Sequence, residues 1–162
     1  MTIVIRRVSP KQEDVRELIH QLDQYQQVLY PDESNHLDPI DALCQPGVHF
    51  VAAYDDLISD GDALGCGAIK YVSELAEKER YGEIKRLYVK QSCRGKGVST
   101  RIMAALESDA LEKGIGIVRL ETGIFQDEAI GLYKKIGYLK TGAFGPYSDE
   151  DPFSVFMEKK LN

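Results

Sequence analysis

The N-terminal third of the chain carries a hydrophobic pattern with the period of an α-helix. Apolar residues recur there at intervals of three and four, which places them on one helical face. They are Val15, Leu18, Ile19, Leu22, Tyr25 and Leu29. The preceding Ser9-Pro10-Lys11-Gln12 has the form of a capping box with proline at the first helical position. We therefore predict a helix that begins at Pro10 and ends before Pro31.

Shorter apolar runs with the lengths of β-strands flank and follow this helix. Residues 2–8 form the first run, and residues 48–54, 63–72 and 81–89 form three more at close spacing. The intervening stretch 55–62 is rich in Asp and Gly, as turns are. Such short connections predict an antiparallel arrangement of the strands. A short helix is expected near residues 40–44, between two prolines.

Helical spacing returns twice in the second half of the chain. Val98, Ile102 and Leu106 mark one helix, which Gly114 closes, and residues 129–136 form another. Strand-like runs lie at residues 115–121, 138–144 and 153–159. The order predicts an α/β fold with a mixed central sheet of about seven strands and about four helices. We expect a single domain that covers residues 1–162.

Composition excludes several classes of function. The formal net charge is −6 and the chain has no basic cluster, which argues against a nucleic-acid partner. No apolar run is long enough to cross a membrane, and the first residues lack the features of a signal peptide, so a cytoplasmic protein is expected. Cys44, Cys66 and Cys93 form neither a CxxC pair nor a cluster with histidine, so neither a disulfide framework nor a metal site is expected. His20, His36 and His49 are isolated and are expected to be structural or surface residues.

The stretch Arg94-Gly95-Lys96-Gly97-Val98-Ser99 stands where a predicted strand passes into a helix. Glycines at such a junction expose several backbone N–H groups, and the positive end of the helix attracts an anion to them. Arg94 and Lys96 add positive charge. The Walker pattern is absent, and Thr100 stands where the dinucleotide pattern GxGxxG needs its third glycine. The sequence therefore predicts an anion-binding loop of another kind.

Two segments resemble the GNAT acyltransferases. Residues 94–99 resemble the RxxGxG/A pyrophosphate loop of that family, with Ser99 at the position of the last Gly or Ala. Residues 129–138, AIGLYKKIGY, look like the family's AxxLYxxxGF segment. The order of strands and helices also agrees, so the resemblance covers nearly the whole chain. Within the family, the chain looks most like a subgroup of small bacterial proteins described as N-acetyltransferases. It implies the GNAT acyl-CoA N-acyltransferase fold, in which two parallel strands, here residues 81–89 and 115–121, splay apart around acetyl-CoA.

The resemblance also implies roles for particular residues. Tyr133 matches the tyrosine that protonates the departing CoA thiolate, and Glu83 matches a strand glutamate that serves as general base. Both have a simpler interpretation, Tyr133 as core and Glu83 as a surface residue paired with a neighbouring cation. The expected cofactor-binding residues are Leu87, Tyr88, Val89, Arg94, Gly95, Lys96, Gly97, Val98, Ser99 and Gln126. Acetyl-CoA is the expected cosubstrate, and the reaction requires no metal.

The acceptor is expected to be the primary amine of a small molecule such as an amino acid. Glu121 is the alternative to Glu83 as general base, or would hold the amine. Arg86 would pair with a carboxylate of the substrate. Tyr147 lies in an acidic loop that suits a cation. Acetylation of a protein lysine or N-terminus, and an acyl-CoA-binding regulatory module without turnover, remain alternatives. The run Phe153-Ser154-Val155-Phe156-Met157 suits either a homodimer contact or a buried strand.

Overall fold

The computed structural model describes residues 1–73 and 79–162. The strands are β1 (Ile3–Arg7), β2 (Val48–Asp55), β3 (Gly65–Val72), β4 (Tyr81–Val89), β5 (Ile117–Gly123), β6 (Leu139–Thr141) and β7 (Ser154–Lys160). The α-helices are α1 (Glu13–Leu29), α2 (Ile40–Leu43), α3 (Val98–Glu112) and α4 (Asp127–Lys135). Two short 3-10 helices, Asp32–Ser34 and Gln91–Cys93, follow α1 and precede α3. The predicted mixed sheet with four helices is confirmed.

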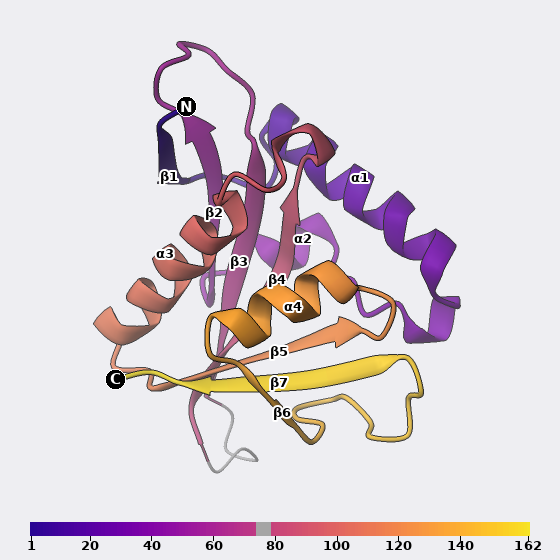
Figure 1. The fold of residues 1–162 in the computed structure, drawn as a ribbon. Helices are drawn as coiled ribbons and strands as arrows, with labels where there is room; N and C mark the ends of the chain where they lie inside the picture. Colours follow the sequence, from indigo (N-terminus) through magenta and orange to yellow (C-terminus); the bar gives the residue numbers. More distant parts are fainter. Residues whose placement is uncertain (74–78) are drawn as a thin grey trace.

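The strands form one sheet in the order β1-β2-β3-β4-β5-β7-β6. All neighbouring pairs are antiparallel except β4 and β5, which run in parallel in the middle of the sheet. Figure 1 shows these two strands diverging, with β5 and β7 turned away from the first four strands. The sheet is therefore split at its only parallel pair in the described part of the chain.

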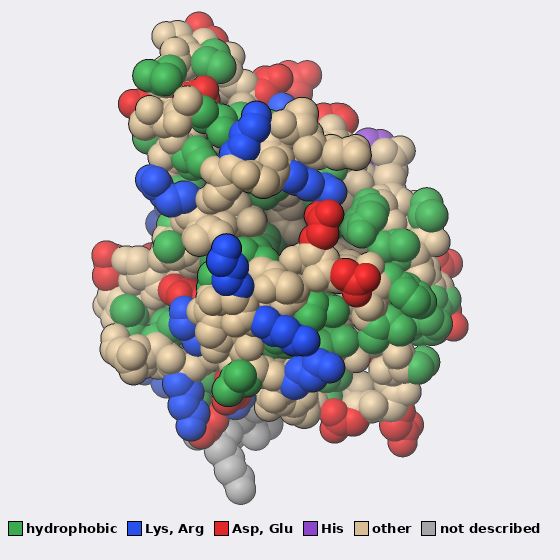
Figure 2. Space-filling view, viewed as in Figure 1, with side chains coloured by type: hydrophobic (Ala, Val, Ile, Leu, Met, Phe, Trp, Pro, Cys, Tyr) green, Lys and Arg blue, Asp and Glu red, His purple; other side chains and the backbone are tan. Residues whose placement is uncertain are grey.

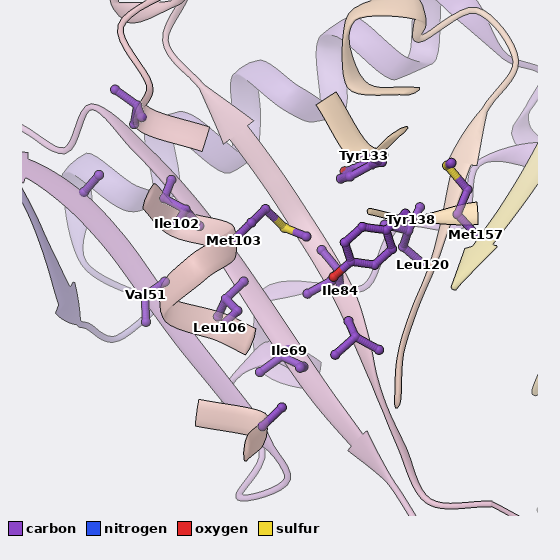
Figure 3. Packing of buried hydrophobic residues seen from close by; sticks show 14 of the residues in the cluster. Val51, Ile69, Ile84, Ile102, Met103, Leu106, Leu120, Tyr133, Tyr138 and Met157 are labelled. Atoms are coloured by element: carbon purple, nitrogen blue, oxygen red, sulfur yellow. The ribbon is translucent and has the colours of Figure 1, made fainter. Parts of the chain in front are cut away.

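The helices cover opposite faces of the sheet, as the strands' alternation requires. Val51 and Ala53 of β2 pack in one cluster with Ile102 and Leu106 of α3 and with Tyr133 of α4. Figure 3 shows this core, in which the Met103 and Tyr138 side chains lie over the sheet near Ile84 and Leu120. The intervening β2 residues Phe50 and Ala52 pack instead against α1 and α2 on the other face.

The predicted start of the first helix is wrong by three residues, because α1 begins at Glu13 and not at Pro10. Ser9 Oγ accepts from the Lys11 N–H at 3.2 Å and makes no capping box. The side chain of Asp14 fixes the first turn instead, since its carboxylate accepts from the N–H groups of Val15 at 2.9 Å and Ala63 at 2.9 Å. This anchor to the loop before β3 sets where the helix begins.

The late strands are shorter or shifted relative to the prediction. The strand expected at residues 138–144 is limited to Leu139–Thr141, and the last strand is Ser154–Lys160. β7 lies between β5 and β6, and its Phe156 and Met157 are buried in the sheet. The aromatic run therefore has a place in the core of this chain.

Candidate active site

The split between β4 and β5 is produced by a bulge in β4. The two strands pair only from Gly82 to Ile84, opposite Val118 to Leu120. On the other side of β4 the register slips by one residue: Ala68 faces Lys85, whereas Cys66 faces Tyr88. Arg86, inside the slip, has a left-handed backbone with φ of 56°. An extra residue of this kind bends a strand, so β4 leaves β5 and keeps an edge without a strand partner beyond Ile84.

A groove of about 730 Å³ opens beside this free edge and runs to the loop before α3. Every residue expected to bind the cofactor lines it except Lys96, which is exposed in the same loop. Leu22 and Tyr25 of α1, Phe125 before α4 and Leu132 of α4 add to its apolar wall. Figure 2 shows this face hollowed between the loop and α4, with hydrophobic side chains gathered over the end of α1.

The loop before α3 has the conformation that an anion-binding site needs. Gly95 and Gly97 have φ of 75° and 81°, and a Cβ on either would meet nothing within 4 Å. Glycine is therefore required there for its backbone conformation. Gly97 precedes the first residue of α3, whose first N–H groups have no acceptor within the helix. These amides and the helix dipole suit the diphosphate of CoA, so the groove fits this ligand.

The Arg94 side chain contacts the end of β4. Its Nε donates to the Val89 carbonyl at 3.1 Å, and its guanidinium stands 5.6 Å from the centre of the Tyr88 ring. These contacts hold the side chain at the rim of the groove. A positive charge is thereby fixed next to the amides of the loop.

A second, smaller cavity of about 60 Å³ continues from the groove, and Leu22, Leu87 and Gln126 line both spaces. We call it the polar pocket. Its wall carries six charged or titratable residues besides two tyrosines. These residues are His36, Asp38, Glu83, Lys85, Arg86, Glu121, Tyr133 and Tyr147.

Tyr133 is buried on α4 and reaches the wall of the polar pocket. Its ring packs edge-on against Tyr138 at 5.9 Å between centroids. Its hydroxyl makes no hydrogen bond with any residue in the described ranges 1–73 and 79–162. Burial raises the pKa of Tyr133, so the phenol is protonated at neutral pH. The group can therefore donate a proton to a ligand in the pocket.

Glu83 is already engaged by its neighbours. Its Oε2 accepts a hydrogen bond from the Tyr147 hydroxyl at 2.6 Å and stands 3.4 Å from Lys85 Nζ. Lys85 Nζ also donates to the Tyr147 hydroxyl at 2.9 Å and lies 3.4 Å from Asp38 Oδ1. Glu83 as a whole is only 5% exposed. Glu83 therefore belongs to a closed network and is not a surface residue.

Glu121 lies across the pocket at the end of β5 and is less occupied. Its Oε1 accepts from the Ser154 hydroxyl at 3.0 Å, and it makes no ion pair with any cation in the described part of the chain. Burial, opposed in part by His36, raises the pKa of the Glu121 carboxyl. This group is poised to accept a proton nearer neutral pH than an exposed glutamate is.

The guanidinium of Arg86 is already engaged by protein groups. It forms an ion pair with Asp23 of α1, and its Nε and Nη2 donate to the Asp38 carbonyl at 3.2 and 2.6 Å. Through these contacts Arg86 ties the bulge of β4 to α1 and to the segment before α2, and its role toward a substrate carboxylate stays a prediction.

Sequence reasoning missed the contribution of the segment between α1 and α2. His36, expected to be structural or at the surface, lines the polar pocket; its Nε2 lies 3.0 Å from Asp151 Oδ2 and its ring is edge-on to Tyr147. Tyr30 accepts from the Phe125 N–H at 3.1 Å and fills the space beside Gly123, where a Cβ would lie 1.9 Å from the Tyr30 oxygen. The glycine opposite Tyr30 is the only local signal of this contact.

The described residues show neither a metal-binding group nor a membrane-spanning helix. Their His, Cys, Asp and Glu side chains contain no group of three or more that could hold a metal ion. None of their helices has both the length and the hydropathy of a membrane span.

A mixed sheet that splits between two parallel strands, with an anion-binding loop at the split, defines the acyl-CoA N-acyltransferase class. The crystal structure of a Klebsiella pneumoniae protein described as an acyl-CoA N-acyltransferase superimposes on this chain with a TM-score of 0.78 and 37% sequence identity. The superposition covers 99% of this chain and 98% of the other. The fold is also shared with the PaiA N-acetyltransferase of Thermoplasma acidophilum in complex with coenzyme A, at a TM-score of 0.69, 20% identity and coverage of 99% and 100%.

The sequence places the chain more narrowly. Residues 15–138 match the Acetyltransferase (GNAT) family. An IAA acetyltransferase of Azospirillum brasilense is 41% identical over 98% of both chains, and the uncharacterised N-acetyltransferase YsnE of Bacillus subtilis is 34% identical over 83% of both. The chain therefore belongs to the GNAT family of acetyltransferases.

Proposed function

We propose that the protein is an acetyl-CoA-dependent N-acetyltransferase that acts on the primary amine of a small molecule. The observation that supports this proposal is that the groove along β4 continues into the polar pocket. The groove along β4 has the shape and the amides for a CoA thioester, and it leads into a polar pocket whose wall includes the Tyr133 phenol and the Glu121 carboxylate, which has no ion-pair partner among the described residues. A binding module without turnover has no need of the second space.

The groove residues divide the binding of acetyl-CoA between them. The free edge of β4 at Leu87, Tyr88 and Val89 offers backbone groups to the pantetheine amides, as an added strand would. The amides from Gly95 to Ser99 offer donors to the diphosphate. Gln126, which caps the loop after β5 by accepting from the Gly123 N–H at 3.0 Å, stands between groove and pocket. Acetyl-CoA supplies the activated acetyl group.

We assign the proton transfers to two residues of the pocket. Glu121 takes the proton that the amine loses as its nitrogen bonds to the acetyl carbon, because its pKa is raised by burial and no cation holds it. Tyr133 gives a proton to the CoA sulfur as the C–S bond breaks. Glu83, the base expected from the resemblance, instead positions Lys85 and Tyr147 through its short contact with the Tyr147 hydroxyl.

The test is release of CoA thiol from acetyl-CoA with a panel of primary amines and with IAA, the compound in the name of the A. brasilense relative. Tyr133→Phe should lower kcat about 100-fold with little change in acetyl-CoA binding or melting temperature, because its hydroxyl bonds to no described residue. Tyr138→Phe is the matched control, since the Tyr138 hydroxyl bonds to Glu107 at 2.8 Å.

Equal rates for the two variants would remove Tyr133 from the mechanism. Tight acetyl-CoA binding without release of thiol to any amine would contradict turnover of small amines. Transfer to IAA with none to the amines would contradict the proposed amine chemistry while leaving the acetyl-CoA groove in place.

A further inference from the structure

The acceptor pocket has a charge arrangement that bears on the substrate, if the proposed function holds. Arg86 is a cation of its wall, and three donors of its guanidinium are already used by Asp23 and by the Asp38 carbonyl. Its side chain is 5% exposed. A substrate carboxylate would therefore have to compete with Asp23 and with the Asp38 carbonyl for this guanidinium.

Lys85 and His36, the other basic side chains of the wall, also have acidic partners. Lys85 lies 3.4 Å from both Asp38 Oδ1 and Glu83 Oε2 and donates to Tyr147. His36 is paired with Asp151 at 3.0 Å. Both side chains already interact with acidic groups of the protein. A substrate carboxylate would therefore enter an environment of net negative charge and find no basic group without a partner among the described residues of the wall.

Glu121 is the exception, because none of the ion pairs in the described part of the chain includes it and its one hydrogen bond comes from the neutral Ser154 hydroxyl, although Lys85 and His36 lie near enough to favour its charged form. Its burial disfavours the carboxylate form, and a ligand ammonium would supply the missing positive charge. The pocket therefore lacks a cation for a substrate and holds a carboxylate ready for one.

Arg86 also separates the polar pocket from a wider groove between α1 and α2. It lines both spaces, and the outer groove of about 1170 Å³ is bordered by Asp23, Ile40 and Asp41 among others. The Asp23–Arg86 pair is thus part of the wall between the two, and Asp23 sets where the guanidinium lies.

We infer that the pocket accepts a cationic primary amine with no carboxylate beside the amine, that Glu121 binds this amine, and that Asp23 enforces the preference by holding Arg86. Asp23 acts through Arg86 and is a specificity-determining residue, not a catalytic one. An α-amino acid is a poor acceptor for this site.

The experiment compares compounds that differ only beside the reacting amine: leucine, leucinamide and isoamylamine, with phenylalanine, phenylalaninamide and phenethylamine as a second set. Values of kcat/KM are expressed per ammonium form of each compound, because that is the form Glu121 is inferred to bind. We expect each uncharged amide and each amine to exceed its amino acid by at least about tenfold. The amide retains the branch at the α-carbon, so it separates the effect of charge from that of size.

Asp23→Asn should reduce the ratio of amide to amino acid several-fold, because Arg86 is then available to the carboxylate. Asp41→Asn is the matched control: it removes the same charge from the same outer groove, where Asp41 pairs with Lys11 at 3.6 Å and not with Arg86. Glu121→Gln should raise KM for the amines more than it changes acetyl-CoA affinity.

The outcomes separate this inference from the function on which it rests. Amino acids that react as well as their amides, or a ratio that Asp23→Asn leaves equal to that of Asp41→Asn, would overturn the inference while the N-acetyltransferase activity stands. No transfer to any of the six compounds would overturn the proposed small-amine function, and this inference with it.

Discussion

Replacement of Gly97 by alanine isolates the backbone requirement of the anion-binding loop. The added Cβ meets no atom within 4 Å, so the substitution introduces no clash. The cost comes from φ of 81°, where a residue with a Cβ is less stable than glycine by about 1–2 kcal/mol. For a chain of this length that corresponds to a melting temperature lower by roughly 2–8 °C.

Gly116→Ala is the control, because its Cβ also meets nothing within 4 Å and its backbone lies outside the left-handed region. It should leave the melting temperature unchanged or slightly raised. Gly97→Asn should fall between the two, since asparagine tolerates the left-handed conformation better than alanine. Scanning calorimetry gives the stabilities and titration with acetyl-CoA gives the Kd, which should rise for Gly97→Ala as the loop amides turn away. Equal stability and equal Kd for Gly97→Ala and Gly116→Ala would refute the loop geometry.

Three further substitutions test separate parts of the site and fold. Gly123→Ala should destabilise the protein by about 1–3 kcal/mol in urea unfolding, because its Cβ would lie 1.9 Å from the Tyr30 oxygen and displace that buried ring. Tyr147→Phe should lower kcat/KM about tenfold in the thiol-release assay, because Glu83 loses its 2.6 Å donor. Burial lowers the pKa of His49, so its neutral form is favoured on folding; the free energy of unfolding should fall as pH drops below about 6.5, and less so in His49→Gln.

The periodic parts of the fold could be predicted from the sequence because their signal is local. Helical spacing located α3 and α4, and Gly114 and Gly137 end them with φ of 73° and 105°. The loop at Gly95 and Gly97 was found because a strand, two glycines and a helix are adjacent in the chain. These features depend on neighbours within a few residues, where sequence patterns carry information.

The acceptor pocket could not be predicted in this way. His36 and Asp151 are 115 residues apart, and Tyr30 and Phe125 are 95 apart, so no local pattern connects them. Tyr133 shows a different difficulty, because one apolar stripe of α4 serves both the core and the pocket wall. The sequence leaves open whether Tyr133 is a core or a catalytic residue, and the structure places it in the core cluster and in the pocket wall at once.

The bulge of β4 explains why the charges of the pocket gather on one face. Along a regular strand successive side chains alternate, so of Lys85 and Arg86 one would point into the apolar core under α3. The extra residue removes that alternation: Lys85 contacts the Asp38 carboxylate, and Arg86 contacts the Asp38 carbonyl. Ile84 before them and Leu87 after them both pack in the core with α3. One left-handed residue therefore opens the sheet at the groove proposed for acetyl-CoA and also places two consecutive cations against the segment that borders the polar pocket.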